Sequence, residues 1–293
     1  DHHYQIGDEV NLDAAVVARY AVGVIGSGLM GTQIAEYLVQ MGYPVILKTR
    51  DPGNVEGIIS KIRKRLSKRL QEQEVEECLE NLVITTDYAD LSDVDIIIEA
   101  SKEDLDVKKD VFAELSGVCK TTTIFATNSS SLSIDALAAV TDRPEQFIGL
   151  HFFNPVHRMD LIEVVVGSNT SDETKKFAIN LAHDLKKQPI LVKNSPGFIV
   201  NRLLLPQINE AIRLLGDGIA SKEDIDSAVK LGLNHPMGPF ELADFIGLDI
   251  CLSILEVLHA GLGDDHFEPA PLLREMVEEG KLGYKSGEGF YTY

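Results

Sequence analysis

The chain has 293 residues, more than one hydrophobic core usually organises, so we expect two domains. Hydrophobic residues make up 44% and charged residues 25% of the sequence, which is ordinary for a globular protein and excludes a disordered or fibrous chain. The net charge of -19 argues against binding to nucleic acid or to an anionic membrane surface, because both would repel the protein.

Two further observations bear on where the protein works. No stretch approaches the run of about 18 apolar residues that a membrane span needs, and residues 1–7 lack the pattern of a secretory signal. A cytoplasmic location is therefore expected. The cysteines match no metal or redox spacing, so we expect buried, reduced thiols. They are Cys78, Cys119 and Cys251.

Short β-branched runs alternate with helical stretches between Tyr20 and Val192. The runs are Ala21–Ile25, Val45–Leu47, Leu82–Ile84, Val94–Ile98, Thr122–Phe125, Phe147–Leu150, Leu161–Val166 and Ile190–Val192. This alternation predicts a mostly parallel, doubly wound α/β sheet of the Rossmann type, covered by helices. Residues 1–20 precede the first strand as an extension, in which Asn11–Arg19 could form a short helix.

The strand signals stop after Asn194–Gly197, and apolar residues then recur at helical spacing. They are Ile199, Leu203, Ile208, Ile212 and Leu215. Further helices are expected after Ser221 and after Gly238. The sequence therefore predicts an α/β domain over residues 1–193, extension included, and an all-helical domain over residues 194–293.

A glycine-rich turn follows the first predicted strand and leads into a helical stretch, Thr32–Met41. The turn reads Gly26-Ser27-Gly28-Leu29-Met30-Gly31. In this context a G-x-G-x-x-G motif allows the backbone to approach a pyrophosphate at a helix N-terminus. We therefore predict a dinucleotide site here, although such a turn without that context is more often only a turn.

The end of the second predicted strand bears on which dinucleotide binds. An acid that would bind the ribose hydroxyls of NAD is expected there, but Thr49 occupies the position. Arg50 beside it can grip a 2′-phosphate, which favours NADP slightly over NAD. The alternative is that Lys48 and Arg50 are solvated charges and that Asp51 serves as the acid.

Polar residues gather after three later strands, where parallel sheets place their sites. Hydroxyl groups of Thr127–Ser131 could orient a substrate oxygen, or one serine could cap the next helix. His151 follows a strand, and Glu163 stands alone inside an apolar one. A carboxylate buried in such a strand needs a partner, and we predict that His151 is that partner and acts as a base.

Several ordered motifs resemble those of the 3-hydroxyacyl-CoA dehydrogenases, including bacterial 3-hydroxybutyryl-CoA dehydrogenases, from about Ala21 to Tyr293. The glycine-rich turn is the first of these motifs. The others are Ala126–Ser131, Gly149–Val156, Asn194–Arg202 and Gly238–Asp244. The missing acid at Thr49 departs from the family and puts NAD itself in doubt, and Ser129 stands where threonine is frequent.

The resemblance implies roles for matching residues. His151 would take the proton from the C3 hydroxyl of the substrate, and Glu163 would orient it. Ser130 would hydrogen-bond the reacting oxygen, and Asn201 would position the substrate. Residues assigned to the cofactor are Leu29 and Met30 at the pyrophosphate turn, Glu103 and Asn154 near the nicotinamide, and Asn128.

A basic cluster stands out in this acidic chain. It comprises Lys61, Arg63, Lys64, Arg65, Lys68 and Arg69, within what reads as one long helix from Glu56 to Cys78. These charges could be a solvated helix face balanced by nearby glutamates. The family resemblance implies instead part of a coenzyme A site, for which we choose Lys61 and Lys68. An acidic acyl carrier protein could use the same patch.

The function expected is the interconversion of a 3-hydroxyacyl-CoA and a 3-oxoacyl-CoA by hydride transfer with NAD or NADP. One alternative keeps the chemistry on an acyl-carrier-protein thioester, and another is a noncatalytic dinucleotide-binding structural protein. The family resemblance also implies a homodimer formed through the helical domain, and no metal is expected.

Overall fold

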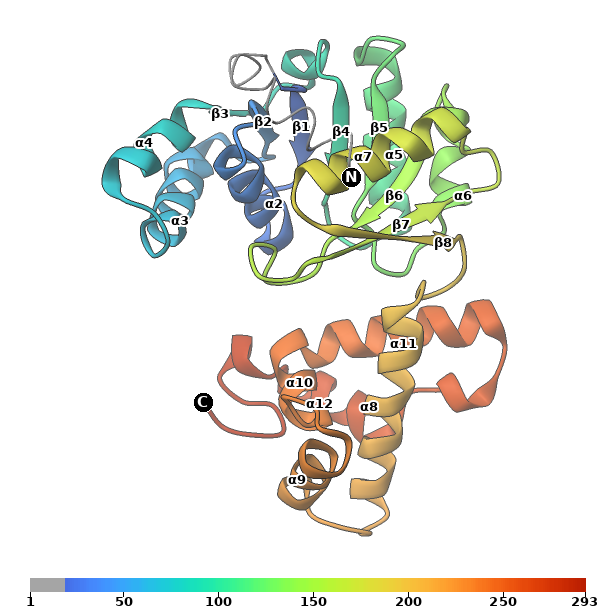
Figure 1. Cartoon of the computed structure of the whole chain (residues 1–293). Helices are drawn as coiled ribbons and strands as arrows, with labels where there is room; N and C mark the ends of the chain where they lie inside the picture. Colours follow the sequence, from blue (N-terminus) through green and yellow to red (C-terminus); the bar gives the residue numbers. More distant parts are fainter. Residues whose placement is uncertain (1–18) are drawn as a thin grey trace. The chain divides into compact units, whose positions relative to one another are not determined.

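The structure is a computed structural model that describes residues 19–293, so residues 11–18 of the expected short helix lie outside the described residues. The chain forms two compact units. The first comprises residues up to Ser129 together with Ser133–Asn194, and the second comprises Ser130–Leu132 with Ser195–Tyr293. The α/β elements lie in the first unit and the helices from α8 onward in the second (Figure 1).

One eight-stranded sheet organises the first unit, with the strand order β3-β2-β1-β4-β5-β6-β7-β8. Its strands are β1 (Val22–Ile25), β2 (Val45–Lys48), β3 (Leu82–Thr85), β4 (Ile96–Glu99), β5 (Ile124–Thr127), β6 (Phe147–His151), β7 (Leu161–Val166) and β8 (Gln188–Lys193). Every neighbouring pair is parallel except β6 and β7. The predicted fold class is confirmed, and the order 3-2-1-4 places a topological switch point beside β1.

Helices connect the strands of this unit. They are α2 (Leu29–Gln40), α3 (Val55–Ser67), α4 (Glu72–Glu80), α5 (Leu105–Val118), α6 (Ile134–Ala138) and α7 (Asp172–Asp184). The prediction of one helix from Glu56 to Cys78 was wrong, because the chain breaks between Ser67 and Glu72 and forms the α3–α4 pair (Figure 1). Gln71 is the N-cap residue of α4, and its backbone N–H donates a hydrogen bond to the side chain of Glu74.

Apolar side chains from the strands, α2, α3 and α7 form the core of the first unit, with Leu38, Leu47 and Ile98 fully buried. On α3 the buried residues are Ile58, Ile62 and Leu66, at helical spacing. The hydrophobic pattern of α3 therefore fixes which of its charged side chains face inward.

The second unit is helical, as predicted. Its helices are α8 (Val200–Gly216), α9 (Lys222–Leu233), α10 (Pro239–Ile246), α11 (Leu248–Leu262) and α12 (Pro271–Glu278). Ser221 caps α9 as expected, and Phe240 and Leu255 lie in the core. Within residues 19–293 no single helix is long and apolar enough to span a bilayer; α10 and α11 together pass on length and composition alone, with a 97° bend between them.

Candidate active site

The glycine-rich turn has the geometry its sequence predicts. Gly26 has a φ of +107°, and a Cβ there would lie 2.5 Å from the carbonyl oxygen of Ala100. A side chain at Gly31 would overlap the carbonyl oxygen of Gly26. A Cβ at Gly28 would meet no atom within 4 Å, so the space beside the N-terminus of α2 is open. That opening suits a pyrophosphate, which would meet the first N–H groups of the helix.

The residues after β2 carry no free acid at the expected position. Thr49 is buried, and its Oγ1 lies 2.9 Å from Oγ of Ser27 in the glycine-rich turn. Arg50 is exposed beside it. The carboxylate of Asp51 accepts a hydrogen bond of 2.8 Å from a backbone N–H and so caps the next 3-10 turn. Asp51 thus has a structural task in the chain.

His151 and Glu163 face each other across the antiparallel strands β6 and β7, where they are directly paired in register. The Nδ1 atom of His151 lies 2.7 Å from Oε1 of Glu163. Glu163 is 0% exposed and His151 is 7% exposed. A carboxylate on Nδ1 fixes the tautomer and the orientation of the ring, so Nε2 is the atom that can exchange a proton. The structure brings together the pair that the trapped acid predicted.

Asn128 and Asn154 hold neighbouring strand ends in place. The Oδ1 of Asn128 accepts a hydrogen bond from the backbone N–H of Phe152 at 2.8 Å. The Oδ1 of Asn154 accepts one from Gln33 Nε2 on α2 at 3.0 Å, and Gln33 Oε1 accepts one from Val156 N at 2.9 Å. Gln33, which the sequence did not single out, thus links the segment after His151 to α2 by two hydrogen bonds.

A second buried carboxylate, Glu99, ends β4. Its Oε2 accepts a hydrogen bond from Lys108 Nζ at 2.6 Å, and its Oε1 accepts one from Thr127 Oγ1 at 2.6 Å. Lys108 also lies 3.4 Å from Glu103, whose other oxygen accepts from Ser129 Oγ at 2.9 Å. Sequence reasoning missed Glu99 and Lys108. The signal was present, because Glu99 directly follows an apolar run, as Glu163 sits within one.

Ser130 and Asn201 come together in the second unit, where Asn201 Nδ2 donates to the backbone oxygen of Ser130 at 3.3 Å. The idea that one of the serines in Thr127–Ser131 caps the next helix was wrong. Ser133 does so, because its Oγ accepts a hydrogen bond from Ala136 N at 3.1 Å. The N-cap of α6 is therefore Ser133 and none of the serines at positions 129–131.

The basic cluster divides into two sets. Arg65 and Arg69 bind the buried carboxylate of Glu36 on α2, and Arg63 pairs with Glu76 at the surface. Three exposed residues form no ion pair with a carboxylate within residues 19–293. These are Lys61, Lys64 and Lys68. Lys61 and Lys64 lie on α3 and Lys68 is its C-cap, and their spacing of three and four residues places them on one side of the helix.

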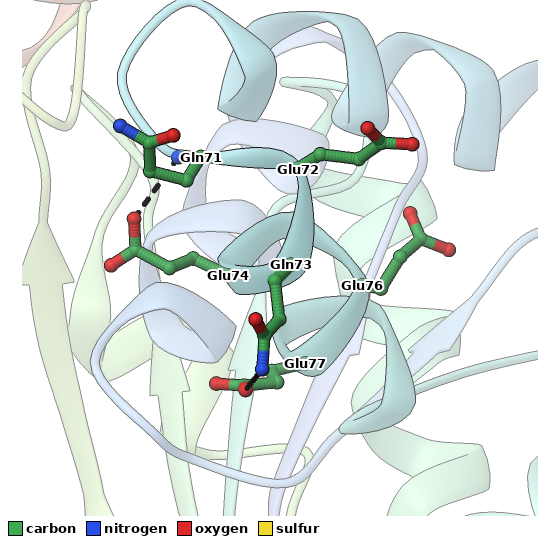
Figure 2. Close-up of a pocket in the computed structure, with 6 residues that line it drawn as sticks. All are labelled: Gln71, Glu72, Gln73, Glu74, Glu76 and Glu77. Atoms are coloured by element: carbon green, nitrogen blue, oxygen red, sulfur yellow. Dashed lines mark hydrogen bonds between the residues drawn. The ribbon is translucent and has the colours of Figure 1, made fainter.

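Two surface hollows lie away from the predicted site. Figure 2 shows one of them, lined by Gln71, Glu72, Gln73, Glu74, Glu76 and Glu77. Its carboxylates would repel the phosphates of a nucleotide or of coenzyme A. The other lies in the helical unit and is lined in part by Phe245, Tyr284 and Tyr293. Neither hollow contains a predicted site residue.

Comparison with known proteins decides the family. The profile of the 3-hydroxyacyl-CoA dehydrogenase NAD binding domain matches residues 21–195, and that of the C-terminal domain matches residues 197–293. The chain belongs to the 3-hydroxyacyl-CoA dehydrogenase family. The resemblance predicted from the motifs is therefore confirmed.

Individual members of the family are similar over nearly their whole length. The 3-hydroxybutyryl-CoA dehydrogenase of Clostridioides difficile is 47% identical over 277 residues, which cover 93% of this chain and 99% of that protein. The human mitochondrial hydroxyacyl-coenzyme A dehydrogenase is 43% identical over 284 residues, covering 93% and 90%. The structure of (S)-3-hydroxybutyryl-CoA dehydrogenase from Ralstonia eutropha gives a TM-score of 0.88 at 44% identity, covering 94% and 99%.

Family membership also confirms the predicted reaction. The protein is an oxidoreductase that interconverts a 3-hydroxyacyl-CoA and a 3-oxoacyl-CoA by hydride transfer with a nicotinamide cofactor.

Proposed function

We propose that His151 is the general base of this 3-hydroxyacyl-CoA dehydrogenase. Its Nε2 takes the proton from the C3 hydroxyl during oxidation and returns it to the ketone during reduction. Glu163 stabilises the imidazolium through the 2.7 Å contact to Nδ1. Ser130 hydrogen-bonds the reacting oxygen, and Asn201 positions the substrate. The single observation that carries this proposal is the buried, register-paired His151–Glu163 couple.

The open space beside Gly28 supports a dinucleotide site at this turn. We assign its pyrophosphate to the turn from Gly26 to Gly31, with Leu29 and Met30 opening α2. Near the nicotinamide we place Glu103, Asn128 and Asn154. When bound, the nicotinamide supplies the centre that accepts or returns the hydride at C3. The chain's own contribution is the proton acceptor and the groups that bind the reacting oxygen.

A slight preference for NADP over NAD is part of the proposal. Two features support it: the hydroxyls of Thr49 and Ser27 meet where the family carries an acid, and Asp51 is engaged as a cap. Arg50 is then the group that reads the 2′-phosphate. Close by, Lys48 lies over the ring of Tyr88, and burial lowers the pKa of this lysine, as does the neighbouring Arg50.

We propose that Lys61 and Lys68 hold the coenzyme A part of the substrate. Support comes from their exposure on α3 and from the absence of an ion-pair partner within residues 19–293. Cationic side chains without an internal partner are available to the phosphates of the carrier. An acyl-carrier-protein thioester remains the rival carrier that the experiment below distinguishes.

We also propose that residues 1–193 form the dinucleotide domain and 194–293 the substrate and dimerisation domain. A homodimer would cover apolar side chains that the second unit exposes, among them Leu203, Ile219, Leu231 and Leu233, of which Leu231 is 87% exposed. Light scattering should give twice the chain mass for the parent protein, and a monomer after Leu231→Glu and Leu233→Glu together.

A cytoplasmic location and a role in fatty acid metabolism complete the proposal. The three cysteines are buried free thiols, as predicted, which suits a reducing compartment. Burial raises the pKa of Cys119 to about 11 and that of Cys251 to about 12, so neither is a ready nucleophile.

A thioester panel tests the function. The 3-oxobutyryl and longer 3-oxoacyl thioesters of coenzyme A and of acyl carrier protein are each reduced with NADH and with NADPH. The proposal predicts the highest kcat/KM for a coenzyme A thioester with NADPH. Faster reduction of the acyl-carrier-protein thioesters would support the rival carrier, and no turnover on any thioester would contradict the proposed catalysis.

A further inference from the structure

Glu36 is an acid buried on the helix that opens at the phosphate loop. Its side chain is 3% exposed and lies between the guanidinium groups of Arg65 on α3 and of Arg69, two residues beyond the end of that helix. Arg65 Nε donates to Oε1 at 2.5 Å, and Arg69 Nη2 donates to Oε2 at 2.9 Å. Both carboxylate oxygens are therefore occupied by charge-assisted hydrogen bonds, which are stronger than neutral ones.

The two arginines continue this contact along α2. Arg65 Nη2 donates to Thr32 Oγ1 at 3.0 Å, and that hydroxyl donates to the carbonyl oxygen of Gly28 in the phosphate loop at 2.8 Å. Arg69 Nη2 also donates to Gln40 Oε1 at 2.7 Å. Thr32, Glu36 and Gln40 are four residues apart, so Arg65 of α3 and Arg69 just after it together contact α2 at three successive turns.

The same helix carries the exposed lysines. Lys61 and Lys64 of α3 and Lys68 at its C-cap form a row that neighbours Arg65 and Arg69. A rotation or slide of α3 against α2 would move this lysine row relative to the phosphate loop. The contacts of Glu36 oppose that movement.

We propose that Glu36 is a positioning residue that fixes the lysine row of α3 relative to the cofactor site and thereby controls binding of the phosphate-bearing end of coenzyme A. This inference rests on the proposed carrier site at Lys61 and Lys68. Without the carboxylate, Arg65 and Arg69 repel each other and separate from α2, and the lysine row loses its fixed orientation.

The test compares two thioesters with Glu36→Gln. One is 3-oxobutyryl-CoA, and the other is the 3-oxobutyryl thioester of N-acetylcysteamine, which has no phosphates to meet the lysines. We expect KM for the CoA thioester to rise about tenfold, while kcat and KM for the truncated thioester change less than about twofold. A merely structural loss would affect both thioesters equally, and that result, or no change in either, would overturn the inference.

Two further variants keep the test decisive. Glu76→Gln removes the exposed ion pair between Arg63 of α3 and Glu76 of α4, and it should leave the kinetics with both thioesters unchanged. If circular dichroism shows that Glu36→Gln does not fold, Arg69→Gln replaces it, because it removes one of the two arginine contacts. It should then raise KM for the CoA thioester alone, and an equal effect on both thioesters would overturn the inference.

Lysine variants separate this inference from the proposed carrier site. Lys61→Ala and Lys68→Ala should each raise KM for the CoA thioester and not for the truncated one. If they do and Glu36→Gln does not, the inference fails and the carrier site stands. If neither lysine variant changes KM for the CoA thioester, the proposed carrier site is wrong, and the inference about Glu36 is wrong with it.

Discussion

Glu163 and Glu99 are buried to the same degree in the same sheet, yet their partners differ in chemistry. Each is 0% exposed, and each binds a basic side chain at 2.6–2.7 Å. Glu163 binds an imidazole, the side chain that gains and loses a proton near neutral pH. Glu99 binds an ammonium group, a type of side chain whose ordinary pKa of about 10.4 lies well above neutral pH. A buried carboxylate therefore requires a basic partner, and the type of partner determines whether the pair can take part in proton transfer.

Replacing Glu99 should give the largest effect on stability. Glu99→Gln leaves the buried ammonium of Lys108 without its nearest carboxylate, so we expect the free energy of unfolding to fall by about 3 kcal/mol in urea denaturation. Combining it with Lys108→Met removes both charges and should restore part of the loss. If Glu99→Gln lowered the free energy of unfolding by less than about 1 kcal/mol, the ion pair of Glu99 with Lys108 would not have the structural role proposed for it.

Replacing Glu163 should act mainly on the reaction. In Glu163→Gln the imidazolium loses its counter-charge, and kcat should fall on the order of 10²-fold while KM for the cofactor stays near its parent value. Steady-state kinetics of the double variant with His151→Gln supply the control. The double variant should be no slower than His151→Gln alone, and a further full loss would show that Glu163 acts independently of the imidazole.

Replacing Arg50 should have a smaller effect on catalysis, because this side chain is exposed and forms no ion pair with a carboxylate among the described residues 19–293. Arg50→Ala should raise KM for NADPH about tenfold through the lost contact to the 2′-phosphate, and change KM for NADH little. Arg274→Ala, which removes another exposed arginine, is the control and should change neither. Equal changes for both cofactors after Arg50→Ala would refute the assigned role.

The fold could be read from the sequence because each strand is a short β-branched run and the helices follow a different period. All eight predicted strands are present, with ends shifted by a few residues, as for β4, which begins at Ile96 and not at Val94. The break after Ser67 was missed, since the charged residues that follow are as compatible with a helix as with a turn.

The site could be predicted only in part. The lone acid of β7 identified the pairing of Glu163 with His151, because burial demands a partner. Glu99 ends its strand, where a charged side chain is commonly exposed to solvent, so its burial could not be predicted from that position alone. Which members of a basic cluster turn inward depends on the neighbouring helix, so the contacts of Glu36 with Arg65 and Arg69 became visible only in the structure.

Single-turnover kinetics of His151→Gln test the central claim most directly. With 3-oxobutyryl-CoA and saturating NADPH, the rate of absorbance loss at the nicotinamide should fall on the order of 10³-fold, with cofactor affinity and the free energy of unfolding close to those of the parent. A rate within about tenfold of the parent, in a folded variant that binds the cofactor normally, would contradict the role of His151 as the base.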